Sequence, residues 1–227
     1  MKNLRTRFIL LLNTVCLGAV LLTLVACTPI ASHTPNDQTP TIALAPLSLW
    51  QERVFATKTN YSLIESNEHA VIHAHSDASA SMLYQQKTVN LQQTPYLQWQ
   101  WKVSNTFTDI NEQSKQGDDF SARVYIAVKA KNGSFYPRVL CYVWANHSPK
   151  GSHWSSPYSN DAIIIAQQSG DSRVHQWVSE KINVKADLQR YFQEEIDEIE
   201  GIAIMTDSDN SKGKADAFYR QLFFSAQ

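Results

Sequence analysis

Two neighbouring carboxylates and a guanidinium group stand at the start of one predicted strand. Asp118 and Asp119 follow Gly117, and Arg123 comes four residues after Asp119. Glycosidases place two carboxyl groups around the scissile bond, roughly 5 Å apart for retention and roughly 6.5–9.5 Å apart for inversion. Adjacent strand residues point to opposite faces, so Asp118 and Asp119 alone do not form such a pair. The pattern predicts either ligand contacts or a structural turn in which one aspartate caps the turn and the other pairs with Arg123.

A second group of oxygen-bearing side chains lies near the end of the chain. Asp207, Asp209 and Asn210 are spaced densely, as in calcium-binding loops. An EF-hand loop needs glycine at its sixth place and glutamate at its twelfth, where this sequence has Lys212 and Phe218. We predict a polar turn between two strands and assign no metal ligand or cofactor, with a calcium site of another type as the alternative.

Aromatic residues give the clearest indication of a ligand. Flat rings beside carboxylates, amides and arginine suit sugars, whose apolar faces stack on rings while their hydroxyl groups need hydrogen bonds. The alternative is that these rings fill the core, because alternation alone does not tell which face of a sheet is wet. The predicted glycan-binding residues are Asp118, Asp119, Arg123, Tyr125, Trp144 and Trp154.

Other reactive side chains point to structural roles. Cys141 lies in the apolar run 139–144 and is expected to be a small core residue rather than a nucleophile. His73 and His75 share a strand face but have no evident third ligand, so we expect solvent-facing histidines. Because the sequence also lacks a serine nucleophile elbow, a phosphate-binding glycine loop, HExxH and CxxC, we predict no catalytic residue.

The elements that must position these residues are mostly strands. In 97–103 and 122–128, apolar residues alternate with polar ones, so Arg123 and Tyr125 are expected on the same face. One stretch, 187–199, has apolar residues at helical spacing. Further strands are predicted at 61–65, 70–76, 81–84, 139–144, 162–166, 174–184, 202–206 and 218–224. The fold class predicted is all-β, a mainly antiparallel β-sandwich of jelly-roll or galactose-binding-like type with one short helix.

The N-terminal segment predicts where the protein works. Lys2, Arg5 and Arg7 precede an apolar run, so residues 1–26 have the layout of a secretory signal peptide, with a plain transmembrane helix as the alternative. Leu24–Cys27 resembles the lipobox of bacterial lipoproteins, which implies lipidation of Cys27 and a membrane partner. Thr28 follows the cysteine, and the resemblance to Gram-negative lipoproteins then implies the outer membrane, with the protein facing the periplasm.

Composition bounds the rest of the chain. The proline-containing stretch 27–46 is predicted to be a flexible tether, followed by a single domain at 47–227. Removal of residues 1–26 takes away three of the 20 Lys and Arg and none of the 21 Asp and Glu, leaving a net charge of −4. This balance argues against a nucleic-acid partner.

Five segments resemble a family of bacterial envelope proteins known as domain of unknown function 3047 (DUF3047). They are Ala78–Ser81, Leu97–Val103, Gly117–Tyr125, Cys141–Ala145 and Ile204–Asn210. The family carries no established activity, so the resemblance implies a fold and a compartment rather than a reaction.

The function that the sequence favours is a non-catalytic, outer-membrane-anchored lipoprotein that binds a ligand, with a glycan as the first candidate. One alternative is a polysaccharide hydrolase that uses Asp119 with Asp207 or Asp209. A second alternative is a structural module that binds other envelope proteins.

Overall fold

A computed structural model describes residues 40–65, 70–131 and 137–227. Its elements, in chain order, are a 3₁₀ helix η1 (Leu47–Leu49), β1 (Gln51–Val54), β2 (Asn60–Glu65), β3 (Ala70–Asp77), β4 (Ala80–Asn90), β5 (Tyr96–Val103), β6 (Arg123–Val128), β7 (Arg138–Ala145), β8 (His153–Ser156), β9 (Ser159–Ser169), β10 (Val178–Asn183), α1 (Val184–Phe192), β11 (Glu198–Asp207) and β12 (Lys214–Ser225).

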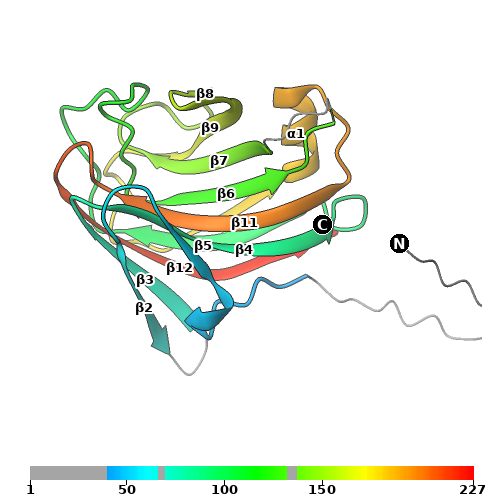
Figure 1. The fold of residues 1–227 in the computed structure, drawn as a ribbon, viewed down its shortest axis with the longest axis horizontal. Coiled ribbons are helices and arrows are strands. Elements are labelled where there is room, and N and C mark those ends of the chain that lie inside the picture. Colours follow the sequence, from blue (N-terminus) through cyan, green and yellow to red (C-terminus); the bar gives the residue numbers. More distant parts are fainter. Residues whose placement is uncertain (1–39, 66–69, 132–136) are drawn as a thin grey trace, which may run out of the picture. The chain divides into compact units, whose positions relative to one another are not determined.

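The strands form two sheets. One has seven strands in the order β1-β4-β11-β6-β7-β9-β8, and the other has five in the order β10-β5-β12-β3-β2. Neighbouring strands are antiparallel except β7 and β9, which run parallel (Figure 1). The fold is therefore the mainly antiparallel β-sandwich with one α-helix that the sequence predicts.

The core lies between the sheets and follows the alternation read from the sequence. In β5 the apolar residues Leu97, Trp99, Trp101 and Val103 are buried, whereas the polar residues between them are half-buried. In β6, Val124, Ile126 and Val128 enter the same cluster, and Tyr125 points the other way. The seven-stranded sheet is thus apolar on its inner face, and its outer face is free to carry other chemistry.

Several elements differ from the sequence prediction. The strand predicted at 174–184 is β10, which covers only Val178–Asn183, because residues 172–175 form turns and Val184 begins the helix. The four-residue strands β1 and β8 were not expected; they are too short for an alternating pattern to stand out. The helix covers Val184–Phe192, with the Asn183 side chain accepting a hydrogen bond from the amide of Ala186, rather than 187–199. It ends because Gln193 takes a left-handed conformation with φ of 57°.

Part of the predicted tether belongs to the folded unit. Ile42 and Leu44 are buried in the main core, and Thr41 bridges to Phe223 of β12. Every described core residue lies between positions 42 and 224, so a chain of residues 38–227 contains the whole compact unit.

The predicted signal peptide, Cys27 and most of the predicted tether lie outside the described residues. Within the described residues, no helix has the length and apolar character needed to cross a bilayer.

Candidate functional site

A cavity of about 440 Å³ lies on the outer face of the seven-stranded sheet. Its floor comes from the strands, and its walls come from segments before β6, after β1, between β8 and β9, and between β11 and β12. The lining residues are Phe55, Ala80, Asp118, Arg123, Tyr125, Cys141, Ser156, Tyr158, Ala162, Ile164, Met205, Asp207, Asp209 and Asn210.

Strand register explains why the floor is apolar. Across the sheet, Tyr84, Ala203, Tyr125, Cys141 and Ile164 are successive cross-strand partners, and all five therefore lie on the same face. Their inner-face neighbours fill the core, which leaves this row to face the cavity side of the sheet. Three members of the row, Tyr125, Cys141 and Ile164, line the cavity. They combine one phenol ring with small or aliphatic side chains, a surface suited to the apolar face of a ligand.

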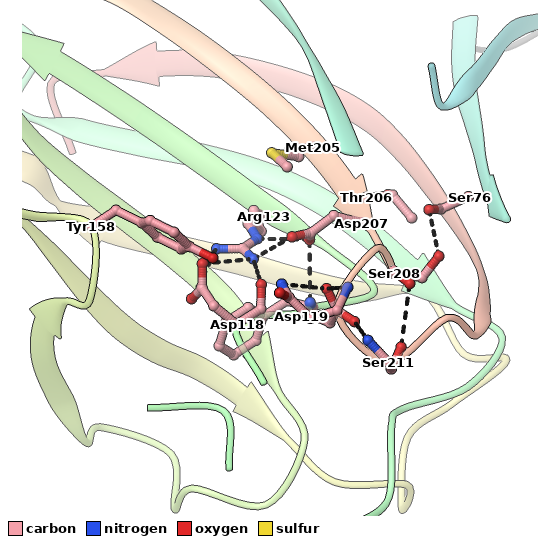
Figure 2. A network of polar contacts seen from close by, with 12 residues as sticks. Ser76, Asp118, Asp119, Arg123, Tyr158, Met205, Thr206, Asp207, Ser208 and Ser211 are labelled. Carbon is pink, nitrogen blue, oxygen red and sulfur yellow. Dashed lines mark hydrogen bonds and ion pairs between the residues drawn. The ribbon is translucent and has the colours of Figure 1, made fainter. Parts of the chain in front are cut away.

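A buried ion-pair network stands at one end of this floor (Figure 2). Arg123, 3% exposed, donates from Nε to Asp207 Oδ1 at 2.8 Å and from Nη2 to Asp207 Oδ2. Its Nη1 lies 3.4 Å from Asp118 Oδ2, and its Nη2 also donates to the carbonyl of Asp118. The guanidinium of Arg123 is thereby held in place by two carboxylates that reach it from different elements.

The pairing of Arg123 with one aspartate of the Gly117–Asp119 turn confirms part of the sequence interpretation. Asp118 provides that pairing, and Gly117 is needed because a Cβ at this position would meet the Asn111 carbonyl oxygen at 2.5 Å. The third member is Asp207, which the sequence analysis placed in a polar turn, with calcium binding or hydrolysis as alternatives, and did not pair with Arg123. Its role depends on β11 pairing with β6, a contact between residues 84 positions apart.

Asp119 has a different task. Its Oδ1 accepts a hydrogen bond from the backbone amide of Asn210 at 3.1 Å, and its Oδ2 accepts one from the amide of Ser211. The carboxylate is fully buried and does not line the cavity. The structure thus corrects the expectation that Asp119 contacts a ligand, because its oxygens hold the turn between β11 and β12.

Burial changes the acidity of the network. It raises the pKa of Asp207 to about 7, although Arg123 acts in the opposite direction. Burial also raises the pKa of Asp118, again against the effect of Arg123. For Arg123, burial opposes the charge, but Asp118 and Asp207 outweigh it and raise the pKa. Burial therefore favours the neutral form of both carboxyl groups, whereas Arg123 favours their ionised form.

Three carboxylates could in principle hold a cation. One oxygen from each of Asp119, Asp207 and Asp209 lies within 4.8 Å of the others. Asp207 is already bound by Arg123, and Asp119 by backbone amides. Calcium takes six to eight oxygen ligands, and a guanidinium beside the site disfavours a second positive charge. We therefore assign no metal to this group.

The predicted aromatic contacts divide into two sets. Tyr125 is on the cavity floor, as expected. Trp144 is 0% exposed in the core between the sheets, where its Nε1 donates to the carbonyl of Gly170. The prediction that a ligand stacks on Trp144 is therefore wrong, because β7 is buried on both faces and places this ring inward. Trp154 packs beside Phe120 on the outer face but does not line the cavity.

Tyr158 is an exposed aromatic residue at the cavity, whereas the sequence predicted Trp144 and Trp154 for this role. It lies between β8 and β9, is 59% exposed, and donates from its hydroxyl to the carbonyl of Lys115 at 3.1 Å. Figure 2 shows its ring extending toward Asp118 and Arg123. An exposed aromatic ring at the rim of a cavity is a typical ligand contact.

Of the residues predicted to be structural, Cys141 is where the sequence placed it, whereas the two histidines are less exposed than predicted. Cys141 is buried, as predicted, although it also forms part of the cavity floor, and burial raises its pKa to about 12. His73 and His75 lie half-buried on the five-stranded sheet and share Asp216 Oδ1 at 2.7 and 2.9 Å.

Sequence reasoning missed Phe55, Met205 and Ile164 as cavity residues. Met205 and Ile164 come from strands that the sequence predicted, but their shared face becomes visible only once the strand order is known. Phe55 follows a strand that the pattern did not reveal.

Comparison with solved structures gives distant similarities. A mutant of the carbohydrate-binding module CBM29-2 has 10% identity and a TM-score of 0.34, covering 83% of this chain and 89% of that one. The xyloglucanase domain of NopAA from Sinorhizobium fredii, solved with cellobiose, has 8% identity and a TM-score of 0.42, covering 78% and 93%. Endoglucanase 3 from Trichoderma harzianum, of family GH12, has 9% identity and a TM-score of 0.43, covering 81% and 100%.

No curated protein matches the chain. A family model described as a protein of unknown function (DUF3047) matches residues 48–223, which include all the described residues that line the cavity. The chain therefore belongs to the DUF3047 family.

Proposed function

We propose that this protein is a non-catalytic binding protein that holds a neutral glycan in the cavity on the outer face of its seven-stranded sheet. The observation that carries the proposal is the cavity itself. Phenol rings form part of its floor and rim, and amide, hydroxyl and charged groups stand at one end. Sugar rings require this combination of stacking surface and hydrogen-bonding groups.

The charges on the cavity wall favour a neutral glycan over an acidic one. Among its described lining residues are three carboxylates, from Asp118, Asp207 and Asp209, and one guanidinium, from Arg123. Asp118 and Asp207 already pair with Arg123, so little positive charge is left for an acidic sugar. Repulsion between like charges would then disfavour uronic acids and sulfated sugars.

Binding accounts for the carboxylates better than hydrolysis does. A glycosidase needs two carboxyl groups that face the scissile bond. Asp119, one member of the hydrolytic pair considered from the sequence, is buried against backbone amides, and both oxygens of Asp207 are bound by Arg123. Asp209 keeps a cavity-facing position, with a pKa raised by burial and by Asp119.

An array of neutral, amino and acidic oligosaccharides tests the proposal directly. Residues 38–227 would be compared with Tyr125→Ala, Tyr158→Ala and, as a control on the helix α1 outside the cavity, Tyr191→Ala. We expect binding to neutral glycans that both cavity variants lose and the control keeps. The proposal is wrong if no neutral glycan binds, or if sugar release accompanies binding in a reducing-end assay.

We further propose that the protein is anchored to the outer membrane through lipid on Cys27 and faces the periplasm. The lipobox-like segment Leu24–Cys27 supports this proposal, and lipid chains together give stable membrane attachment. The test is the full chain expressed in a Gram-negative cell, with Cys27→Ser beside it. Wild type in the outer-membrane fraction and the variant outside it is the expected result; membrane retention of the variant would contradict the proposal.

A further inference from the structure

The outer face of the five-stranded sheet carries a second surface, independent of the cavity. Its cations lie on aromatic rings. Lys102 Nζ lies 4.4 Å from the ring centre of Phe218 and 5.3 Å from that of Trp177. Arg220 Cζ lies 4.0 Å from the ring centre of Trp177, and Lys181 Nζ lies 5.0 Å from that of Tyr96. We call Lys102, Trp177, Lys181, Phe218 and Arg220, together with Tyr96, the basic aromatic face.

These cations are not neutralised within the described part of the chain. Lys102, Lys181 and Arg220 form no ion pair with a described carboxylate, whereas Asp216 pairs with the two histidines and Asp77 with Lys214. The whole chain has a net charge of −1. Positive charge is thus concentrated on one face of a slightly acidic protein, which favours an anionic ligand.

The cations are also held in place before any ligand arrives. The rings beneath them restrict their positions, and Arg220 Nε donates to Gln100 Oε1 at 2.7 Å. Gln100 in turn donates to the hydroxyl of Ser179 at 2.9 Å. Side chains ordered in this way lose less conformational entropy on binding than free lysines would.

Their arrangement follows β5. Lys102 is on this strand, Arg220 lies opposite Gln100, and Lys181 lies opposite Gln98. The backbone positions of the three cations are therefore offset by two residues each along the strand direction, about 7 Å per step, and lie on three adjacent strands. Lys102 and Arg220 share the Trp177 ring, and Lys181 lies apart from them over Tyr96. Cations spread over this distance fit a polymer with several anionic groups better than a single phosphate.

We propose that the basic aromatic face binds an acidic polysaccharide, one whose sugars carry carboxylates along the chain. The cations meet the carboxylates, and the exposed parts of the rings meet the sugar faces. An anionic membrane is a poorer fit. Among the described large apolar residues that are well exposed, only Ile64 belongs to this sheet, and membrane-surface binding needs apolar side chains that insert.

The test uses residues 38–227 and polygalacturonate, with dextran as the neutral polymer and phosphatidylglycerol vesicles as the anionic membrane. Binding would be followed by affinity electrophoresis and calorimetry for wild type, Lys181→Gln, and Lys102→Gln combined with Arg220→Gln. Lys129→Gln, an exposed lysine just after β6, is the matched control. Loss of one charge-assisted contact corresponds to about a tenfold weaker affinity or more.

We expect binding to polygalacturonate but not to dextran, weakened about tenfold by Lys181→Gln and further by the double variant, and unchanged by Lys129→Gln. Binding should weaken as salt rises, since charges are screened. The proposal is overturned by no binding to polygalacturonate, by binding that the variants leave intact, or by binding only to phosphatidylglycerol vesicles. Tyr158→Ala must leave this binding unchanged, so the result is independent of the cavity.

Discussion

Each outer face of the sandwich carries an arginine, and the two arginines differ in their burial and in their pairing with carboxylates. On the seven-stranded sheet, Arg123 is buried and held by Asp118 and Asp207. On the five-stranded sheet, Arg220 is half-buried over Trp177 and pairs with no described carboxylate. The first arginine is committed to the fold and shapes a cavity, whereas the second keeps its charge available at the surface. The same residue type therefore belongs to a buried ion-pair network on one face and lies without a described carboxylate partner on the other.

The two outer faces differ because loops cover that of the seven-stranded sheet. Segments before β6 and between β8 and β9 cover the seven-stranded sheet, so side chains on both of its faces become buried. No comparable second cluster of buried apolar residues occurs on the outer face of the five-stranded sheet within the described chain. A covered face can enclose one small part of a ligand, and an open face can follow an extended one.

The largest effect is expected from Arg123→Met. It leaves two buried carboxylates without their partner, and breaking a buried pair in this way costs about 3–5 kcal/mol. Arg220→Met, the matched change on the open face, should cost about 1 kcal/mol or less. Urea unfolding at neutral pH measures both. Similar losses for the two variants would contradict the contrast between the faces.

Trp144→Ala should destabilise the protein nearly as much, by about 3–5 kcal/mol, because it empties a large volume in the core. Trp177→Ala removes a half-buried ring from the surface and should cost about 1–2 kcal/mol. Thermal or chemical unfolding gives the comparison. If Trp144→Ala leaves stability intact, its assignment to the core is wrong.

A pH series isolates the buried network. Burial raises the pKa of Asp207 to about 7 in the folded protein, whereas the pKa of an aspartate in an unfolded chain is about 4. The folded state binds the proton more tightly, so this contribution to stability is full below about pH 4 and is lost as pH rises through about 7. Between about pH 5 and 8, the free energy of unfolding of wild type should fall by about 2 kcal/mol relative to Asp207→Asn.

The Asp207→Asn comparison removes the titration of histidines elsewhere, which both proteins share. Parallel pH profiles for wild type and variant would show that Asp207 stays ionised throughout this range. Such a result would contradict the raised pKa of Asp207. It would not affect the contacts between Asp207 and Arg123.

Tyr158→Ala should have the smallest effect on stability and a clear effect on binding. The ring is largely exposed, so its removal should change the free energy of unfolding by about 0.5 kcal/mol or less. Loss of its stacking should weaken a neutral glycan about tenfold, or ~1.4 kcal/mol. Calorimetry with the best neutral ligand of the array measures this. Unchanged affinity would move the binding site away from the rim.

Much of this architecture could be predicted from local patterns. Alternation in β5 and β6 located the inner face correctly and placed Arg123 and Tyr125 together on the other face. The pairing of Arg123 with a neighbouring aspartate also followed from short spacing. These features depend on residues within a few positions of one another, where strand geometry alone decides the outcome.

The rest depended on contacts between distant segments. Asp207 reaches Arg123 only through the pairing of β11 with β6. Trp144 could not be placed by alternation, because loops bury the outer face of β7 as well as its inner face. The basic aromatic face was likewise not visible, since Lys102, Trp177 and Arg220 come from three strand regions that meet only in the sheet.

Amide NMR mapping separates the two binding sites that we propose on the two faces. Residues 38–227 would be titrated first with neutral hexasaccharides of glucose, mannose and xylose, and then with polygalacturonate fragments. We expect a neutral sugar to shift signals at Tyr125, Tyr158 and Asn210, and the acidic polymer to shift those at Lys102, Trp177 and Arg220. Shifts on the same face for both ligands, or none on either face, would contradict these proposals.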